Sequence, residues 1–114
     1  MKWIEDRLRE LADADGEYRE FNARIVTTAD PATMLGVRVP RLRALAREVA
    51  RSDDHDAFLA ELPHRWYEEY LMHAFVLNDT RELGRTVDLL DALLPYVDNW
   101  CVCDALNPRA FHDG

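Results

Sequence analysis

Apolar side chains recur at steps of three and four residues along almost the whole chain, which is the spacing of one face of an α-helix. The clearest series is Leu83, Val87, Leu90, Leu94 and Val97. Every strong periodicity in the 114 residues is helical, and only 4 glycines and 5 prolines interrupt it. Such a composition argues against a sandwich or a barrel. The sequence therefore predicts an all-α fold, with Leu83, Val87, Leu90 and Leu94 buried.

Local signals divide this pattern into six or seven helices. The first is expected to stop near Asp15-Gly16, and the second to end before Pro31. Pro40 fits the first turn of the third helix, whereas Pro95 is expected to kink or end the sixth. Expected N-caps are Ser52 or Asp53 for the fourth helix and Asn78-Asp79-Thr80 for the sixth. The seventh is expected to run from Asp98 or Asn99 to Pro108.

Helices joined by short connectors favour stacked antiparallel pairs, as in a HEAT-like α-solenoid or α-α superhelix, with residues 1–114 as a single domain. A HEAT repeat takes ~40–47 residues, and stacks usually need at least three repeats. The chain is therefore expected either to self-associate or to be a truncated front part of a longer architecture. In both cases an uncovered C-terminal apolar patch is expected to include Leu106 and Phe111.

Cellular location is predicted from what the sequence lacks. It contains no apolar run near the ~20 residues of a membrane span and no signal-peptide core, so a membrane partner is not expected. Cys101 and Cys103 are too close together to cross-link the fold. On a helix they point about 200° apart, which favours small buried apolar residues over a zinc or redox pair. A reducing cytoplasm is the expected compartment.

The net charge of −8 is unevenly distributed. Residues 1–52 contain 10 lysines and arginines against 9 acidic residues, whereas residues 53–114 contain 4 against 13. An arginine strip on the third helix, preceded by further arginines, could follow the phosphates of a nucleic acid. The alternative is a solvated helix face, or pairing with the acidic second half. The candidate DNA-binding residues are Arg38, Arg41, Arg43 and Arg47, with Arg51 a weaker candidate.

The candidate catalytic residues are Trp100 and Asp104, which lie four apart and so share one face of the seventh helix. An indole face attracts positive charge, and a carboxylate can stabilise a cation or activate water. The pair therefore suits a cationic substrate. The alternative is a tryptophan packed on a neighbouring helix beside a solvated aspartate.

Other polar residues are expected to be structural. His64, Glu68 and His73 have no third ligand at metal-site spacing, so surface or packing roles are expected. The run Trp66-Tyr67-Glu68-Glu69-Tyr70 is interpreted as core aromatics with solvated acids. No metal, phosphate-binding glycine loop, nucleophile elbow or cofactor motif is found.

Three stretches resemble the bacterial DNA alkylation repair family, the AlkD-like HEAT-repeat DNA glycosylases. They are Leu35-Gly36-Val37-Arg38-Val39-Pro40-Arg41-Leu42-Arg43, Trp66-Tyr67-Glu68-Glu69-Tyr70 and Tyr96-Val97-Asp98-Asn99-Trp100-Cys101-Val102-Cys103-Asp104. Their order and spacing agree with the front part of that family. Members are longer, and further helices supply a DNA-gripping arginine and a second tryptophan, neither of which is matched here.

The resemblance implies double-stranded DNA with N3- or N7-alkylated purines as the partner, and hydrolysis of the N-glycosidic bond as the reaction. It implies Trp100 as the aromatic wall and Asp104 as the catalytic carboxylate, without a cofactor. A different class of function is a non-catalytic HEAT-like scaffold that binds a protein or nucleic acid. A carboxylate beside an exposed tryptophan favours the glycosylase, because phosphate binding alone would disfavour the acid.

Overall fold

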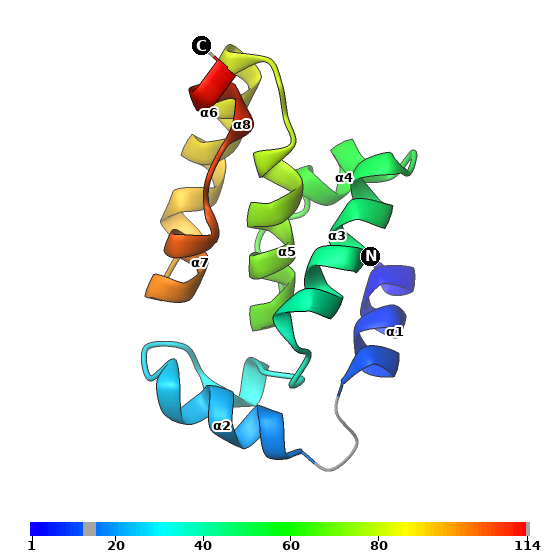
Figure 1. Ribbon diagram of the computed structural model, residues 1–114, viewed down its shortest axis with the longest axis vertical. Coiled ribbons are helices and arrows are strands. Elements are labelled where there is room, and N and C mark those ends of the chain that lie inside the picture. The colour runs from blue at the N-terminus through cyan, green and yellow to red at the C-terminus, as the bar shows by residue number, and fades with distance from the viewer. Residues whose placement is uncertain (13–15, 114) are drawn as a thin grey trace.

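The helix over Tyr67–Asn78 (α5) is buried on almost every face, and the other helices are arranged around it (Figure 1). The computed structural model describes residues 1–12 and 16–113. Within those ranges it contains eight α-helices, two 3-10 helices and no β-strand, so the all-α prediction is confirmed. The remaining α-helices are α1 (Lys2–Leu11), α2 (Glu17–Ile25), α3 (Val39–Arg51), α4 (His55–Ala60), α6 (Leu83–Leu93), α7 (Trp100–Ala105) and α8 (Arg109–Asp113). The 3-10 helices span Pro31–Thr33 and Leu94–Tyr96.

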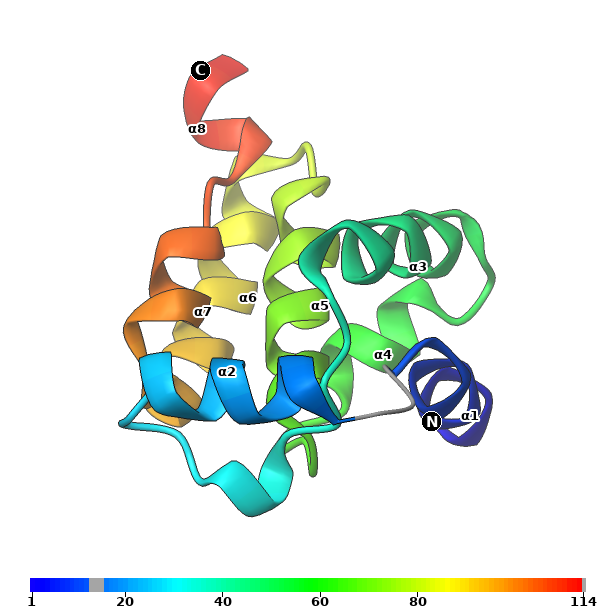
Figure 2. The same cartoon turned by 60° about the horizontal axis from the view of Figure 1, so that its bottom comes forward.

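Helix α5 separates two groups of helices. On one side lie α3 and α4, and on the other lie α6 and α7 (Figures 1 and 2). The most extensive packing joins α3 to α5, and the buried residues of α3 are Leu42, Leu45, Ala46 and Val49. Helix α1 adds Ile4 and Leu8 to the same core. No helix among the described residues combines the length and the apolar character needed to cross a membrane.

Two proline predictions are confirmed, whereas the predicted end of the seventh helix is wrong. Pro40 lies in the first turn of α3, and Pro95 lies in the 3-10 turn that follows α6. The expected helix to Pro108 is wrong, because α7 ends at Ala105 and the chain turns to an extended conformation at Leu106. A proline excludes helix from the residue before it, so a separate eighth helix begins after Pro108.

The predicted N-caps of the fourth and sixth helices are wrong. Ser52 ends α3, and Asp54 precedes α4. Glu82 precedes α6. Asn78 is instead the last residue of α5. The predicted stop near Asp15 lies outside the described residues. Gly16 is described, and it precedes α2 in the left-handed region at φ 74°.

The predicted buried face of α6 is wrong. Leu83, Val87 and Leu94 are 53%, 42% and 49% exposed, and Leu90 is half-buried. The buried residues of α6 are instead Thr86, Leu89 and Leu93. Two leucine-rich stripes with helical spacing share this helix, and periodicity alone does not say which one packs on α5. The stripe of Leu83, Val87 and Leu94 therefore faces solvent in the chain.

The acids of α5 are buried, which corrects the prediction that they are solvated. Glu68 is 0% exposed and Glu69 is 4% exposed. Glu69 accepts the N–H of Trp66 at 3.1 Å, and thereby caps the start of α5 from its third position. Glu68 accepts N–H groups from the loop before α3: those of Leu35 at 3.0 Å and Gly36 at 2.9 Å. Buried carboxylates are tolerated here because backbone donors replace water.

Candidate active site

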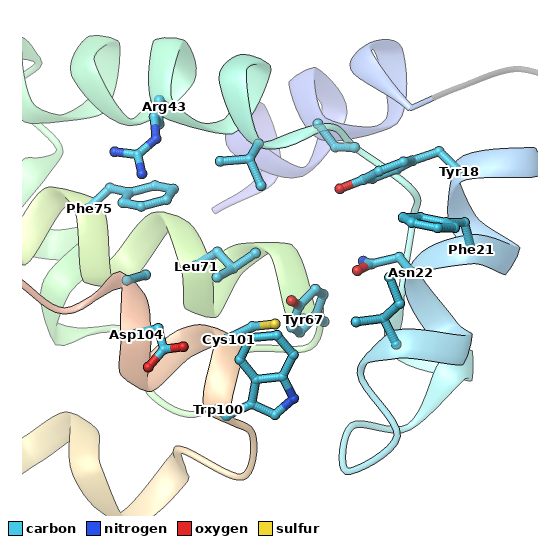
Figure 3. Close-up of a pocket in the computed structure, with 14 residues that line it drawn as sticks. Tyr18, Phe21, Asn22, Arg43, Tyr67, Leu71, Phe75, Trp100, Cys101 and Asp104 are labelled. Atoms are coloured by element: carbon cyan, nitrogen blue, oxygen red, sulfur yellow. The ribbon is translucent and has the colours of Figure 1, made fainter.

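Helices α2, α3, α5 and α7 enclose a cavity of about 350 Å³, which we call the central cavity (Figure 3). Both predicted catalytic residues line it, together with one predicted DNA-binding arginine. The lining residues are Tyr18, Phe21, Asn22, Ile25, Val37, Val39, Arg43, Tyr67, Leu71, Phe75, Trp100, Cys101, Asp104 and Ala105. Most are apolar or aromatic, and Asp104 is the only acid among them. Such a cavity provides an apolar surround for one negative charge.

The start of α7 is fixed by a side-chain cap. The Asn99 side-chain oxygen accepts the N–H of Val102 at 2.9 Å, and the Asn99 amide donates to Asp98 at 2.8 Å. Val102 is fully buried and anchors the helix to the core. With α7 anchored in this way, Trp100 in its first turn and Asp104 one turn later lie toward the central cavity.

The end of α7 is held by Asn78, the last residue of α5. The Asn78 amide donates to the carbonyl of Ala105 at 2.8 Å, and its side-chain oxygen accepts the N–H of Asn107 at 2.8 Å. These two backbone groups belong to the first and the third residue after Asp104. Asn78 is thus a positioning residue for the carboxylate, and sequence spacing gave no signal for it, because its partners lie 27 and 29 residues away.

Asp104 and Trp100 are accessible as well as close together. Trp100 is 53% exposed, and Asp104 is exposed. Asp104 makes no ion pair or hydrogen bond with any other described side chain. Figure 3 shows its carboxylate and the Trp100 indole on the same helix, facing the open space of the cavity. A carboxylate without an internal partner can interact with an incoming cation or water.

The floor of the cavity is formed by Tyr67, Leu71 and Cys101. Burial raises the pKa of the Tyr67 phenol, and a hydrogen bond with Cys101 raises it further. The phenol therefore stays neutral. Cys101 is half-buried, whereas Cys103 is exposed, so the expectation that both cysteines are buried is wrong for Cys103. A spacing of two residues turns Cys103 by about 200° from Cys101 and so places it on the opposite side of α7.

The wall opposite Trp100 is supplied by α2, which has no buried residue of its own. Phe21 and Ile25 are 56% and 45% exposed where they line the cavity. Arg19 holds this helix by donating to the carbonyls of Met34 at 2.8 Å and Pro31 at 3.1 Å. Phe21 and Ile25 are four residues apart and so share one face of α2, and that face lines the cavity.

Gly36 is required where α2 meets the loop before α3. Its φ is +88°, a conformation that other residues rarely adopt. A Cβ atom there would lie 2.8 Å from the Cβ of Arg19. The glycine therefore permits both the turn that presents its N–H to Glu68 and the close approach of α2.

The four predicted DNA-binding arginines do not form a single cluster. The Arg43 guanidinium lies 4.4 Å from the ring centroid of Phe75, at the edge of the central cavity. Arg47 lies one turn along α3 and lines a neighbouring hollow together with Arg43. Arg38 stacks over Tyr18 at 4.8 Å, next to the cavity. Arg41 donates to the carbonyl of Leu11 at 2.8 Å, at the end of α1.

Comparison with protein-family models decides the relationship. The model described as DNA alkylation repair enzyme matches residues 4–113. The chain belongs to this family. No curated protein and no solved structure matched the chain. Membership in the DNA alkylation repair family implies DNA as the substrate, and the family match covers every helix that lines the central cavity.

One group of possible metal ligands occurs among the described residues of this family member. It consists of Glu61, His64 and Glu69, whose ligand atoms lie within 4.8 Å of one another. The N-terminal amine of Met1 pairs with Glu61, and Glu69 accepts the N–H of Trp66. None of these three lines the central cavity, so the group belongs to the packing of α5 rather than to the candidate site.

Proposed function

We propose that the chain is a DNA glycosylase that excises cationic N3- or N7-alkylated purines by hydrolysis of the N-glycosidic bond. Membership in the DNA alkylation repair family supports the substrate class. The single observation that carries the proposal is that Trp100 and Asp104 line one accessible cavity, in which Asp104 is the only acid among the described residues. A lone carboxylate in an apolar surround favours positive charge nearby.

The reaction requires little from the protein beyond the negative charge of Asp104. Alkylation makes the base a positively charged leaving group. When the bond from C1′ to the base breaks, the base takes the electron pair and becomes neutral. The sugar becomes oxocarbenium-like, and the Asp104 carboxylate stabilises it. Water then forms the new bond at C1′ and loses a proton, which the same carboxylate can accept.

Trp100 and the arginines have supporting roles in this proposal. The exposed indole offers its face to the cationic base or sugar, an attraction worth roughly 0.5–2 kcal/mol. Arg43 and Arg47 neutralise phosphates beside the cavity, since both lie along the same side of α3. Arg38 and Arg41 already contact the Tyr18 ring and the Leu11 carbonyl, so binding of DNA by either arginine requires that this contact be shared or broken.

The architecture is part of the same proposal. We infer that residues 1–114 form a single domain of stacked antiparallel pairs related to HEAT repeats, with α5 and α6 as one pair. Self-association through the C-terminal apolar face also stays a prediction. Phe111 is 49% exposed and contributes to that face, whereas Leu106 is half-buried against the core.

The decisive experiment is release of N7-methylguanine from duplex DNA by the full chain. Asp104→Asn removes the charge but keeps the size, so excision is expected to fall by at least about a hundredfold. Asp91→Asn is the matched control, because Asp91 is an exposed acid of α6 that does not line the cavity. An Asp104→Asn variant as active as the parent would remove Asp104 from the mechanism. Binding of DNA without any excision by the parent would favour the scaffold instead.

A further inference from the structure

A second hollow lies on the opposite end of α3 from the central cavity, and we call it the arginine hollow. Its volume is about 370 Å³, and four arginines line it: Arg47, Arg51, Arg81 and Arg109. They come from α3, from the connection between α5 and α6, and from the start of α8. The other lining residues are Ala50 and Asp79. Sequence reasoning missed the cluster because Arg81 and Arg109 lie far along the chain from α3.

The arginine hollow is strongly basic in a chain whose net charge is −8. Arg47, Arg51 and Arg81 make no ion pair or hydrogen bond with another described residue. Among the described lining residues, Asp79 is the one acid beside these three unpaired arginines. Like charges held together repel one another, so an anion that enters such a hollow is stabilised. Guanidinium groups match the geometry of phosphate oxygens, which they can bind in pairs of hydrogen bonds.

A third hollow lies between the arginine hollow and the candidate active site. Arg43 lines both the central cavity and a middle hollow of about 220 Å³. Arg47 and Asp79 line both that middle hollow and the arginine hollow. Arg43, Arg47 and Arg51 recur every four residues, so they rise along α3 in steps of about 6 Å. A row of positive charges thus leads from the cavity to the hollow.

We propose that the arginine hollow is a second binding site for backbone phosphates of duplex DNA, separate from the site of chemistry. This inference rests on the proposed function for its choice of DNA as the ligand. The hollow supplies affinity without reading the base sequence, because phosphate contacts position a protein on DNA but do not specify the bases. It holds the duplex along α3 while the lesion lies near Trp100 and Asp104.

The test is binding of a short lesion-free duplex to the full chain, followed by fluorescence anisotropy at several salt concentrations. Arg51→Gln combined with Arg81→Gln is expected to weaken binding roughly 10- to 60-fold near 0.1 M salt. The slope of log affinity against log salt is expected to become shallower by about 2, since each lost phosphate contact lowers it by about 1. Arg24→Gln combined with Arg85→Gln makes the same charge change, on α2 and α6, and is expected to leave the slope unchanged.

Lysine variants separate a charge effect from a folding effect. Arg51→Lys combined with Arg81→Lys keeps the charge, and is expected to retain most of the affinity and the salt slope. Equal weakening by the two glutamine pairs, or no weakening by Arg51→Gln with Arg81→Gln, would overturn the inference. Because the duplex carries no lesion, this result does not depend on catalysis. If the parent chain excises no alkylated base but its duplex binding still depends on these arginines, only the proposed function is overturned.

Discussion

The Glu68 carboxylate lies against the backbone of Gly36 and accepts its N–H at 2.9 Å, across 32 residues of sequence. The N–H groups of Leu35 and Val37, at 3.0 Å and 3.4 Å, point to the same carboxylate. This contact fixes the loop before α3 to the central helix. It therefore determines where α2 and α3 stand on either side of the central cavity.

Replacing Glu68 by glutamine is expected to destabilise the chain by about 1–3 kcal/mol. The glutamine amide would turn donors toward backbone donors, leaving buried N–H groups unsatisfied. Chemical denaturation measures the change. Glu10→Gln is the matched control, because Glu10 is an exposed acid of α1 whose only ion pair with a described residue is 3.9 Å from Arg7. Equal stability of the two variants would show that the loop does not depend on Glu68.

Replacing Asn78 by alanine is expected to loosen the end of α7 and to cost about 1–3 kcal/mol of stability, since two hydrogen bonds to backbone groups are lost. Faster hydrogen exchange at Asn107 would report the local loss. Asn78→Asp keeps the acceptor for the Asn107 N–H but loses the donor to Ala105, so it should protect that amide better than alanine does. Unchanged exchange in both variants would contradict the positioning role.

Acid is expected to destabilise the fold through two buried histidines. His64 Nε2 and His73 Nδ1 lie 2.8 Å apart, so one ring donates and the other accepts. Burial lowers the pKa of His64 to about 4 and that of His73 to about 3. The unfolded chain titrates near 6.5 and so binds more protons below that pH. Stability should be complete above pH 6.5 and fall as the pH drops toward 4, by about 2 kcal/mol for each ring at pH 5.

The neighbouring Glu69 acts in the opposite direction, because burial raises the pKa of its carboxyl. The net acid effect is therefore smaller than the sum for the two rings. Denaturation with urea at pH 7 and pH 5 measures it. His73→Leu should be less stable than the parent at pH 7 but should lose less on acidification. Parent stability that does not change between these two pH values would be incompatible with neutral buried rings.

The two leucine stripes of α6 are expected to differ sharply in their effect on stability. Leu93→Ala removes a fully buried side chain from the core and should cost about 2–5 kcal/mol. Leu83→Ala is the same change at a side chain that is 53% exposed, and should cost less than about 1 kcal/mol. Thermal or chemical denaturation compares them directly. A larger loss for Leu83→Ala would restore the burial that periodicity alone predicts.

Local signals in the sequence were sufficient for most of the helices and for the core of the site. Proline positions located the start of α3 and the end of α6, because proline acts on its own and adjacent residues. Trp100 and Asp104 were found because residues four apart on a helix share a face. Asn99 was recognised as one of two possible starts for α7, and it caps the helix through its own side chain.

Features that depend on distant partners could not be predicted in this way. The donors to Glu68 lie more than 30 residues away, so an acid among aromatics looked solvated. The orientation of α6 depends on which of two apolar stripes fits α5, and both stripes satisfy the same spacing. Asn78 looked like the cap of the next helix, whereas its partners belong to α7 and the residues after it.

The position of α3 between the central cavity and the arginine hollow makes this helix a rigid spacer of fixed length. Its inner stripe is locked in the core by Leu42, Leu45 and Val49, so the helix cannot rotate to adjust its outer residues. One residue inserted between Arg43 and Arg47 would turn everything beyond it by about 100° and lengthen the helix by about 1.5 Å. The number of residues in α3 therefore fixes the distance and the relative orientation of the two sites. A substitution in this helix preserves both, whereas an insertion changes them.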